Sequence, residues 1–198
     1  MYLYIDMDDV LVHLNVKIAE SLGMSTDEMY SKWKRGAYDA SAAFGVSSEE
    51  IWSIAFREKD FWGDLPAYSW AKDLWNTCNN LGPSYILTAP IYSVPELVPI
   101  CLSGKIKWLH RFTDNPKFEN YVITRHKSHC AKWNHILIDD REKNINEFEA
   151  AGGVGVLFPA IGNKLHEHRK EAYSYILPEL HEKVDKIKKQ EAANILEA

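Results

Sequence analysis

Residues 2–10 read Tyr-Leu-Tyr-Ile-Asp-Met-Asp-Asp-Val, a short apolar run followed at once by carboxylates. The first four residues have the aromatic and β-branched content of a buried strand. Asp6 and Asp8 are two residues apart, which places them on the same side of an extended chain. Mg²⁺ would stabilise such a pair, because it binds one or two carboxylates together with waters and phosphate oxygens. From this stretch alone, a strand that ends in an acidic turn explains the pattern equally well.

Two later stretches repeat the pattern of an apolar run that ends in polar side chains. Residues 84–90 read Ser-Tyr-Ile-Leu-Thr-Ala-Pro, and residues 134–141 read Asn-His-Ile-Leu-Ile-Asp-Asp-Arg. In open α/β sheets, ligands bind outside the carboxyl ends of the strands. Three predicted strands that finish in Asp, Thr and Asp-Asp therefore indicate a site.

The second half of the chain alternates between strand and helix patterns. Strands are predicted at 85–88, 121–124, 136–139 and 154–158, and helices at 104–112 and 145–151. This alternation predicts an α/β fold, with a parallel sheet covered by helices on both faces.

The stretch between the first two strands is much longer than a parallel crossover needs. A helical pattern covers 16–34 with a break at Leu22-Gly23, Ser47 begins another helix, and 70–80 returns to the sheet. We therefore expect three parts. These are an α/β core (1–14 and 76–165), a helical insertion with its return (15–75), and a helical tail (166–198) interrupted at Pro178 that packs on the core or a partner.

Composition narrows the functional classes. The 198 residues are 46% hydrophobic and 26% charged, with a net charge of −5. An acidic chain argues against a polynucleotide partner, which would favour a basic surface. A local basic patch that faces a small anion stays open, built from Lys105, Lys107, Arg111, Arg125 and Lys127.

The cysteines and the hydropathy pattern bear on location. Cys78, Cys101 and Cys130 are odd in number and lack metal-ligand spacing, so we expect free thiols in a reducing compartment. We expect neither a signal peptide nor a membrane-spanning segment, so the predicted location is the cytoplasm.

The motifs together resemble those of the haloacid-dehalogenase-like (HAD) phosphohydrolases. The run 6–10 (Asp-Met-Asp-Asp-Val) is similar to the family's first motif, Thr88 to its second, and Asp139-Asp140 to its fourth. The closest resemblance is to the 5'(3')-deoxyribonucleotidase branch, the cytosolic type C nucleotidases, over roughly residues 2–160. The runs that carry it are 6–8, 10–11, 87–90, 105–109 and 138–141. The resemblance implies a Rossmann-like parallel sheet with a small helical cap inserted after the first strand.

The resemblance also implies a division of chemical roles. Asp6 is the expected nucleophile, which would form a phosphoaspartate. Asp8 would protonate the leaving oxygen and later activate water. The Thr88 hydroxyl and the Ala89 amide would bind a phosphate oxygen. Lys105 would be the family's third-motif ammonium, which balances the nucleophile and the phosphoryl group.

The same resemblance implies how Mg²⁺ would be held. Its expected ligands are a carboxylate of Asp6, the main-chain carbonyl of Asp8 and a carboxylate of Asp140, with Asp139 in support. One position departs from the family pattern, because Asp9 stands where Gly is usual. Asp tolerates unusual backbone angles, but its charge should weaken anion binding unless the side chain points away.

The remaining substrate contacts are predicted at the rim and in the cap. Arg125 and Lys127 follow the strand 121–124, where they either touch substrate phosphate or only solvate the rim. Trp33 and Tyr38 flank a Gly-containing loop and are the rings expected to stack on a base. The alternative for any cap aromatic is the core of the cap. The cap region carries Trp33, Tyr38, Phe44, Trp52, Phe61 and Trp62.

The sequence thus favours an Mg²⁺-dependent phosphomonoesterase for (deoxy)nucleoside monophosphates. We expect no polynucleotide or membrane partner, and a homodimer stays open as an assembly. Two alternatives stay open. One is the same machinery acting on another small phosphomonoester. The other is a catalytically weak, nucleotide-binding protein, for which Asp9 would be the sign.

Overall fold

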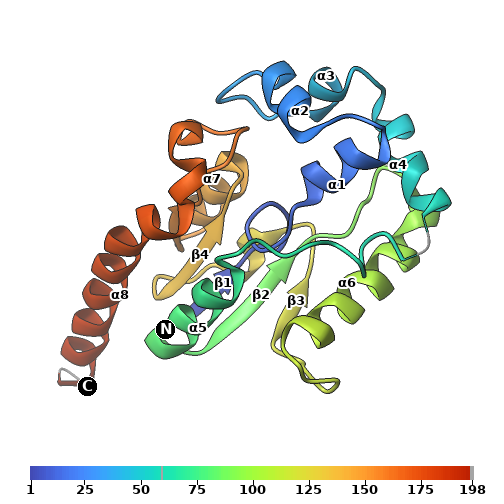
Figure 1. Ribbon diagram of the computed structural model, residues 1–198. Helices are drawn as coiled ribbons and strands as arrows, with labels where there is room; N and C mark the ends of the chain where they lie inside the picture. The colour runs from blue at the N-terminus through green and yellow to red at the C-terminus, as the bar shows by residue number, and fades with distance from the viewer. Residues whose placement is uncertain (59, 197–198) are drawn as a thin grey trace.

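A five-stranded parallel sheet forms the centre of the computed structural model, which describes residues 1–58 and 60–196 (Figure 1). The strands lie in the order β3-β2-β1-β4-β5. Their bounds are β1 Tyr2–Ile5, β2 Ser84–Thr88, β3 Tyr121–Ile123, β4 His135–Asp139 and β5 Val154–Leu157. On the central strand β1, Ile5 is paired with Ile86 on one side and Ile138 on the other. The predicted parallel α/β sheet is confirmed.

Helices cover both faces of this sheet. The bounds are α5 Ala71–Leu81, α6 Val98–Phe112, α7 Glu142–Ala150 and α8 Ala172–Leu196. Side chains alternate along β1, so Leu3 and Ile5 share a core with α5, α6 and α8, whereas Tyr4 packs with Ile145 and Phe148 of α7. In the described part of the chain, no helix combines the length and the apolar character that crossing a membrane requires.

Four short helices between β1 and α5 lie beyond the carboxyl edge of the sheet (Figure 1). They are α1 Leu14–Ser21, α2 Thr26–Lys32, α3 Ala40–Phe44 and α4 Ser48–Arg57. The predicted start signals are confirmed: Ser25 caps α2, and Ser47 with Glu50 forms a capping box on α4. Helix α3 is too short to give a periodic pattern and was not predicted. We propose that residues 15–75, called the cap below, form a unit separate from the core.

Three helices differ from the sequence prediction. Helix α6 begins at Val98 rather than Gly104, because Pro99 fits the first turn, where no amide donor is needed. Helix α7 begins at Glu142 rather than Ile145. The expected interruption at Pro178 is wrong, because α8 runs through this residue. A continuous stripe of buried residues outweighs the lost hydrogen bond. The stripe is Ile176, Leu180, Val184 and Ile187.

The strand order sets the place of the site. From β1 the chain first builds β2 and β3 on one side, and then returns to build β4 and β5 on the other. Such a reversal leaves a crevice at the carboxyl ends of the central strands. Asp6, Thr88 and Asp139 stand at these ends, so the fold brings the three predicted strand endings together.

Candidate active site

Three carboxylates from two neighbouring strand ends converge at the carboxyl edge of the sheet. Asp6 follows β1, Asp139 ends β4, and Asp140 comes next in the chain. One oxygen from each lies within 4.8 Å of the others, and all three residues are buried. Burying this much negative charge requires nearby cations or protons.

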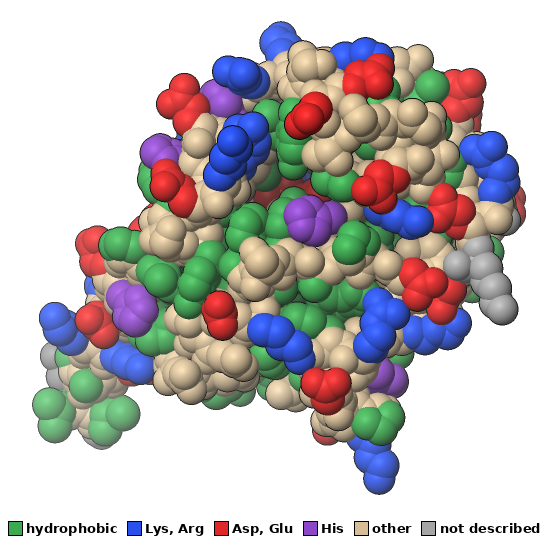
Figure 2. All heavy atoms as spheres, in the orientation of Figure 1, with side chains coloured by type: hydrophobic (Ala, Val, Ile, Leu, Met, Phe, Trp, Pro, Cys, Tyr) green, Lys and Arg blue, Asp and Glu red, His purple; other side chains and the backbone are tan. Residues whose placement is uncertain are grey.

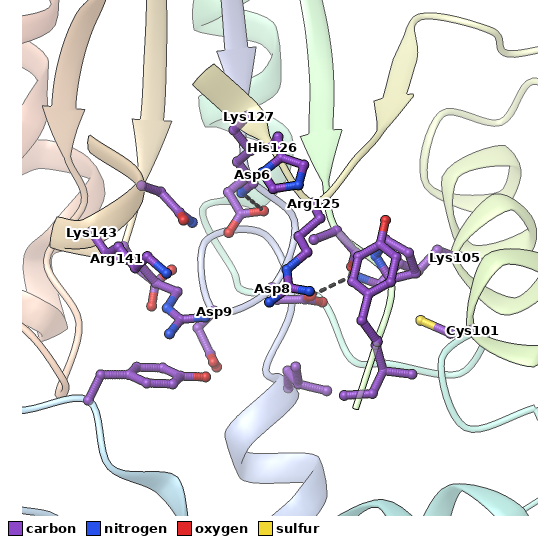
Figure 3. Close-up of a pocket in the computed structure, with 18 of the residues that line it drawn as sticks. Asp6, Asp8, Asp9, Cys101, Lys105, Arg125, His126, Lys127, Arg141 and Lys143 are labelled. Carbon is purple, nitrogen blue, oxygen red and sulfur yellow. Dashed lines mark hydrogen bonds and ion pairs between the residues drawn. The ribbon is translucent and has the colours of Figure 1, made fainter. Parts of the chain in front are cut away.

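Lys127 supplies one of those cations. It lies in the short 3₁₀ turn after β3, and its Nζ is 2.6 Å from Asp6 Oδ1 and 2.5 Å from Asp139 Oδ2 (Figure 3). Burial acts to lower the pKa of Lys127, but Asp139 and Asp6 raise it above its ordinary value, so the ammonium stays charged. The ammonium that balances the expected nucleophile is therefore Lys127, whereas the sequence pointed to Lys105. Lys127 is also buried and is not a solvated rim residue.

Lys105 serves the neighbouring group instead. It projects from α6, and its Nζ donates to Asp8 Oδ2 at 2.5 Å, to Thr88 Oγ1 at 2.7 Å and to the Ala89 carbonyl at 2.8 Å. Only 1% of its surface is exposed. Lys105 thus connects the end of β2 to the loop after β1, and its charge opposes that of Asp8 rather than that of Asp6.

The Asp8 carboxyl combines a paired oxygen with an unpaired one. Oδ2 accepts from Lys105, while Oδ1 is buried without a hydrogen-bond partner among the described residues. Burial raises the pKa of Asp8 above its usual range, Lys105 opposes this effect, and Asp6 adds to it. A carboxyl group whose pKa is raised can hold a proton and deliver it, which a general acid must do.

Asp139 and Asp140 differ in how their oxygens are used. Both Asp139 oxygens accept from Asn144 Nδ2 at 3.0 Å, Oδ1 also accepts from the Arg141 amide, and Oδ2 is bound by Lys127. Among the described residues, no group donates a hydrogen bond to the Asp140 carboxylate, and burial followed by Asp139 and Asp9 raises its pKa well above the usual range. An all-oxygen cluster with a carboxylate lacking a donor fits a hard divalent cation. The Asp140 carboxylate is accordingly freer to bind a cation than that of Asp139, whose oxygens already accept hydrogen bonds.

A cavity with a volume of about 450 Å³ opens above these groups, between the sheet edge and the cap. In the space-filling view, acidic side chains are visible in a recess below the helices at the top (Figure 2). The residues that line it are mostly polar or aromatic and include Asp6, Asp8, Asp9, Leu14, Tyr38, Trp52, Trp62, Ala89, Tyr92, Lys105, Arg125, Lys127, Asp140 and Arg141. The structure therefore brings most of the predicted site residues to one cavity. Thr88, Asp139 and Trp33 do not line it, but Thr88 contacts Lys105 and Asp139 contacts Lys127, both of which do.

The aromatic wall of this cavity differs from the predicted one. Tyr38 is 45% exposed, and its ring lies 4.0 Å from the Arg141 guanidinium carbon. Trp33 is only 3% exposed and does not line the cavity, because its indole packs against Phe44 and donates to the Ala37 carbonyl. Trp33 therefore belongs to the core of the cap, the alternative that the sequence left open. Trp52 lies on the wall, which its spacing in the sequence did not reveal.

Two further residues on the wall come from loops. Tyr92 was not predicted, and only its position four residues after Thr88 connects it with the site. Arg125 is exposed, lies 5.7 Å from the Tyr92 ring centroid and faces the cavity (Figure 3). Its position is compatible with a substrate contact.

The structure shows where the extra carboxylate of Asp9 points. Its φ is 55°, the left-handed conformation that the usual Gly would adopt easily. The carboxylate accepts hydrogen bonds from Asn15 and points away from Asp6 (Figure 3). Burial, together with Asp8 and Asp6, raises the pKa of Asp9 to about 7. The extra acid thus lies beside the cavity but is turned toward α1.

Comparisons with solved structures support this fold. A haloacid dehalogenase-like hydrolase from Xanthomonas campestris has a TM-score of 0.53 at 10% identity, covering 96% of this chain and 94% of its own. A HAD family hydrolase from Deinococcus radiodurans, with bound phosphate and sodium, has a TM-score of 0.52 at 15% identity, covering 92% and 95%. A family IA HAD hydrolase from Entamoeba histolytica has a TM-score of 0.50 at 14% identity, covering 94% and 99%. At such low identities the likeness shows the fold.

The family is shown by sequence. No curated protein matches this chain at a significant level. The family model described as 5' nucleotidase, deoxy (pyrimidine), cytosolic type C protein matches residues 1–176, which include every strand and the whole strand-end site. The chain therefore belongs to the cytosolic type C family of deoxy-pyrimidine 5'-nucleotidases, and it is a hydrolase of the phosphatase type on a HAD-like fold.

Proposed function

We propose that the protein is an Mg²⁺-dependent phosphomonoesterase that acts through a phosphoaspartate on Asp6, with (deoxy)nucleoside monophosphates as substrates. The observation that carries this proposal is the buried cluster of Asp6, Asp139 and Asp140 at the floor of a ring-lined cavity. Lys127 neutralises only part of the cluster's charge. The cluster is therefore suited to a cation and a phosphate together.

Asp6 is held in the orientation that a nucleophile needs. Its Oδ1 accepts from the Met7 amide at 2.8 Å and pairs with Lys127, so Oδ2 is the oxygen that attacks phosphorus. A divalent cation held by Asp6, Asp140 and the Asp8 carbonyl would offset the repulsion between the attacking carboxylate and the phosphate dianion.

Asp8 and Lys105 complete the reaction cycle. Asp8 gives its proton to the oxygen of the leaving alcohol, and then takes a proton from the water that hydrolyses the phosphoaspartate. Lys105 keeps Asp8 and the Thr88 hydroxyl in register, since its ammonium contacts both. Thr88 and the Ala89 amide stabilise the charge on the phosphoryl oxygens.

The cavity wall supports a nucleoside as the leaving group. Tyr38, Trp52 and Tyr92 supply aromatic surface above the acids, and stacking of a base on such rings contributes about 1–3 kcal/mol. The description of the family names deoxy-pyrimidine nucleotides, which agrees with this wall. We also infer a cytoplasmic location, supported by the three free cysteines and the family's cytosolic type.

A phosphate-release screen tests this function. The panel holds 5'- and 3'-monophosphates of ribo- and deoxyribonucleosides, with p-nitrophenyl phosphate as a ringed substrate without sugar or base, each assayed with Mg²⁺ and with chelator. We expect the highest kcat/KM for deoxynucleotides and no turnover with chelator. A preference for another small phosphomonoester would overturn the substrate assignment alone. Nucleotide binding without turnover would overturn the enzyme assignment.

A further inference from the structure

Asp9 adopts a backbone conformation that its side chain does not favour. Its φ of 55° is disfavoured for residues with a Cβ and unstrained for Gly. A carboxylate close to Asp6, Asp8 and Asp140 also raises the charge density of the site. Both effects disfavour Asp at this position. We therefore expect its side chain to make an interaction that compensates for the backbone strain and the added charge.

The compensating interaction is a pair of hydrogen bonds to the first turn of α1. Asp9 Oδ1 accepts from the Asn15 amide at 3.1 Å, and Oδ2 accepts from Asn15 Nδ2 at 2.5 Å. Asn15 is the second residue of α1 and is 7% exposed. At a helix N-terminus the amides lack partners within the helix, and an acid there is stabilised by the helix dipole. The side chain of His13, which precedes the helix, makes no capping hydrogen bond.

The two ends of this contact belong to different parts of the site. Asp9 directly follows Asp8, and its amide donates to the Val12 carbonyl at 2.9 Å within the tight turn after β1. At the other end, α1 begins with Leu14, which lines the cavity. The Asp9–Asn15 contact therefore fixes the turn that carries Asp8 to the first helix of the cap.

We propose that Asp9 is a positioning residue that caps α1 from the catalytic turn and thereby holds Asp8 in place. This inference rests on the proposed function. It makes the opposite prediction from the view that Asp9 is a harmful charge: replacing Asp9 with Gly, the usual residue, slows the reaction although it relieves backbone strain and removes a repulsive acid.

The test compares four variants in the full-length protein with Mg²⁺. For Asp9→Gly and Asn15→Ala we expect kcat per folded molecule to fall by about tenfold on both a deoxynucleotide and p-nitrophenyl phosphate, with KM within about threefold. Asp9→Asn should restore kcat, because Asn tolerates a positive φ and the side-chain amide of Asn15 can turn over to keep both hydrogen bonds. Asp114→Gly is the matched control, since Asp114 has a φ of 52° but lies exposed beside Lys72.

Amide hydrogen exchange at Asn15 reports on the contact independently of turnover. We expect faster exchange in Asp9→Gly and wild-type protection in Asp9→Asn. A kcat for Asp9→Gly equal to or above that of the wild type overturns the proposal, as does a thermal shift with unchanged kcat, which would mean a purely structural role. If the wild type hydrolyses no phosphomonoester, the proposed function fails instead, and the exchange data alone show whether the cap on α1 exists.

Discussion

The strand-end cluster and the cap are organised by different physical means. The cluster of Asp6, Asp139 and Asp140 and its neighbours Asp8, Lys105 and Lys127 are connected by short polar contacts of 2.5–2.8 Å between groups that are mostly buried. In the cap, aromatic rings pack at centroid distances near 6 Å, as between Trp33 and Phe44 or between Trp52 and Trp62. The difference suggests that the cluster sets the chemistry and the cap sets the substrate, and the two can be tested separately.

The largest effect is expected at the nucleophile. Asp6→Asn keeps the shape of the side chain but removes the attacking carboxylate, which should leave less than about a hundredth of the rate on every substrate. Phosphate release from a deoxynucleotide and from p-nitrophenyl phosphate measures this, with circular dichroism as the folding control. Residual turnover above that level would mean that the phosphoaspartate mechanism is wrong.

The cation should report on the same cluster. Mg²⁺ at about one hundred times its Kd should stabilise the wild type against unfolding by about 2.7 kcal/mol. Asp140→Asn should abolish this stabilisation and most turnover, because it removes the carboxylate that lacks a donor within the described chain. Asp73→Asn, an exposed acid on α5, is the control. An unchanged Mg²⁺ effect in Asp140→Asn would contradict the ligand assignment.

The two buried lysines should differ in how far Mg²⁺ compensates for their loss. Lys127→Gln leaves Asp6 and Asp139 without their shared cation, so we expect about 3–5 kcal/mol of lost stability in urea unfolding without metal. Added Mg²⁺ should restore part of this loss, because the proposed ion site lies in the same cluster.

Lys105→Gln is the comparison for that experiment. The partner of Lys105 is Asp8, which lies outside the cluster of three carboxylates, so Mg²⁺ should restore little of the stability that Lys105→Gln loses. Equal responses of the two variants to Mg²⁺ would mean that the lysines share one role.

The cap should respond through KM rather than through the chemical step. Tyr38→Ala removes an exposed ring from the cavity wall and should raise KM for nucleotides by about tenfold to hundredfold, with turnover of p-nitrophenyl phosphate nearly unchanged. Trp33→Ala empties a buried site, so it should lower the free energy of unfolding by about 3–5 kcal/mol and affect both substrates alike. Equal losses on both substrates in Tyr38→Ala would make that ring a structural element.

The smallest effect is expected at the start of α4. Ser47→Ala removes one half of the capping box and should lower the free energy of unfolding by about 1 kcal/mol. Thermal melting detects this change, and kcat on p-nitrophenyl phosphate should stay at the wild-type value. A fall in kcat would show that cap stability and chemistry are coupled.

Sequence reasoning succeeded where function depends on local pattern. The strand endings at Asp6, Thr88 and Asp139 were predicted because each polar residue directly follows an apolar run, and parallel strands deliver such endings to one edge. The capping box at Ser47 was also predicted from a local pattern, the spacing of Ser47 and Glu50. Asp9 was identified as unusual, and its φ of 55° agrees with the expectation that Asp tolerates unusual backbone angles there.

The sequence by itself therefore determined the sheet, the acids at its edge and the family. Only the tertiary structure decided which lysine meets which acid, because Lys105 and Lys127 lie in a helix and a short turn whose approach to the edge depends on packing. It also decided that Trp33 is core while Tyr38 and Trp52 face the cavity, since short helices joined by loops give no periodicity that fixes a face. The direction of the Asp9 carboxylate toward Asn15 was likewise set by the turn that places α1 beside it.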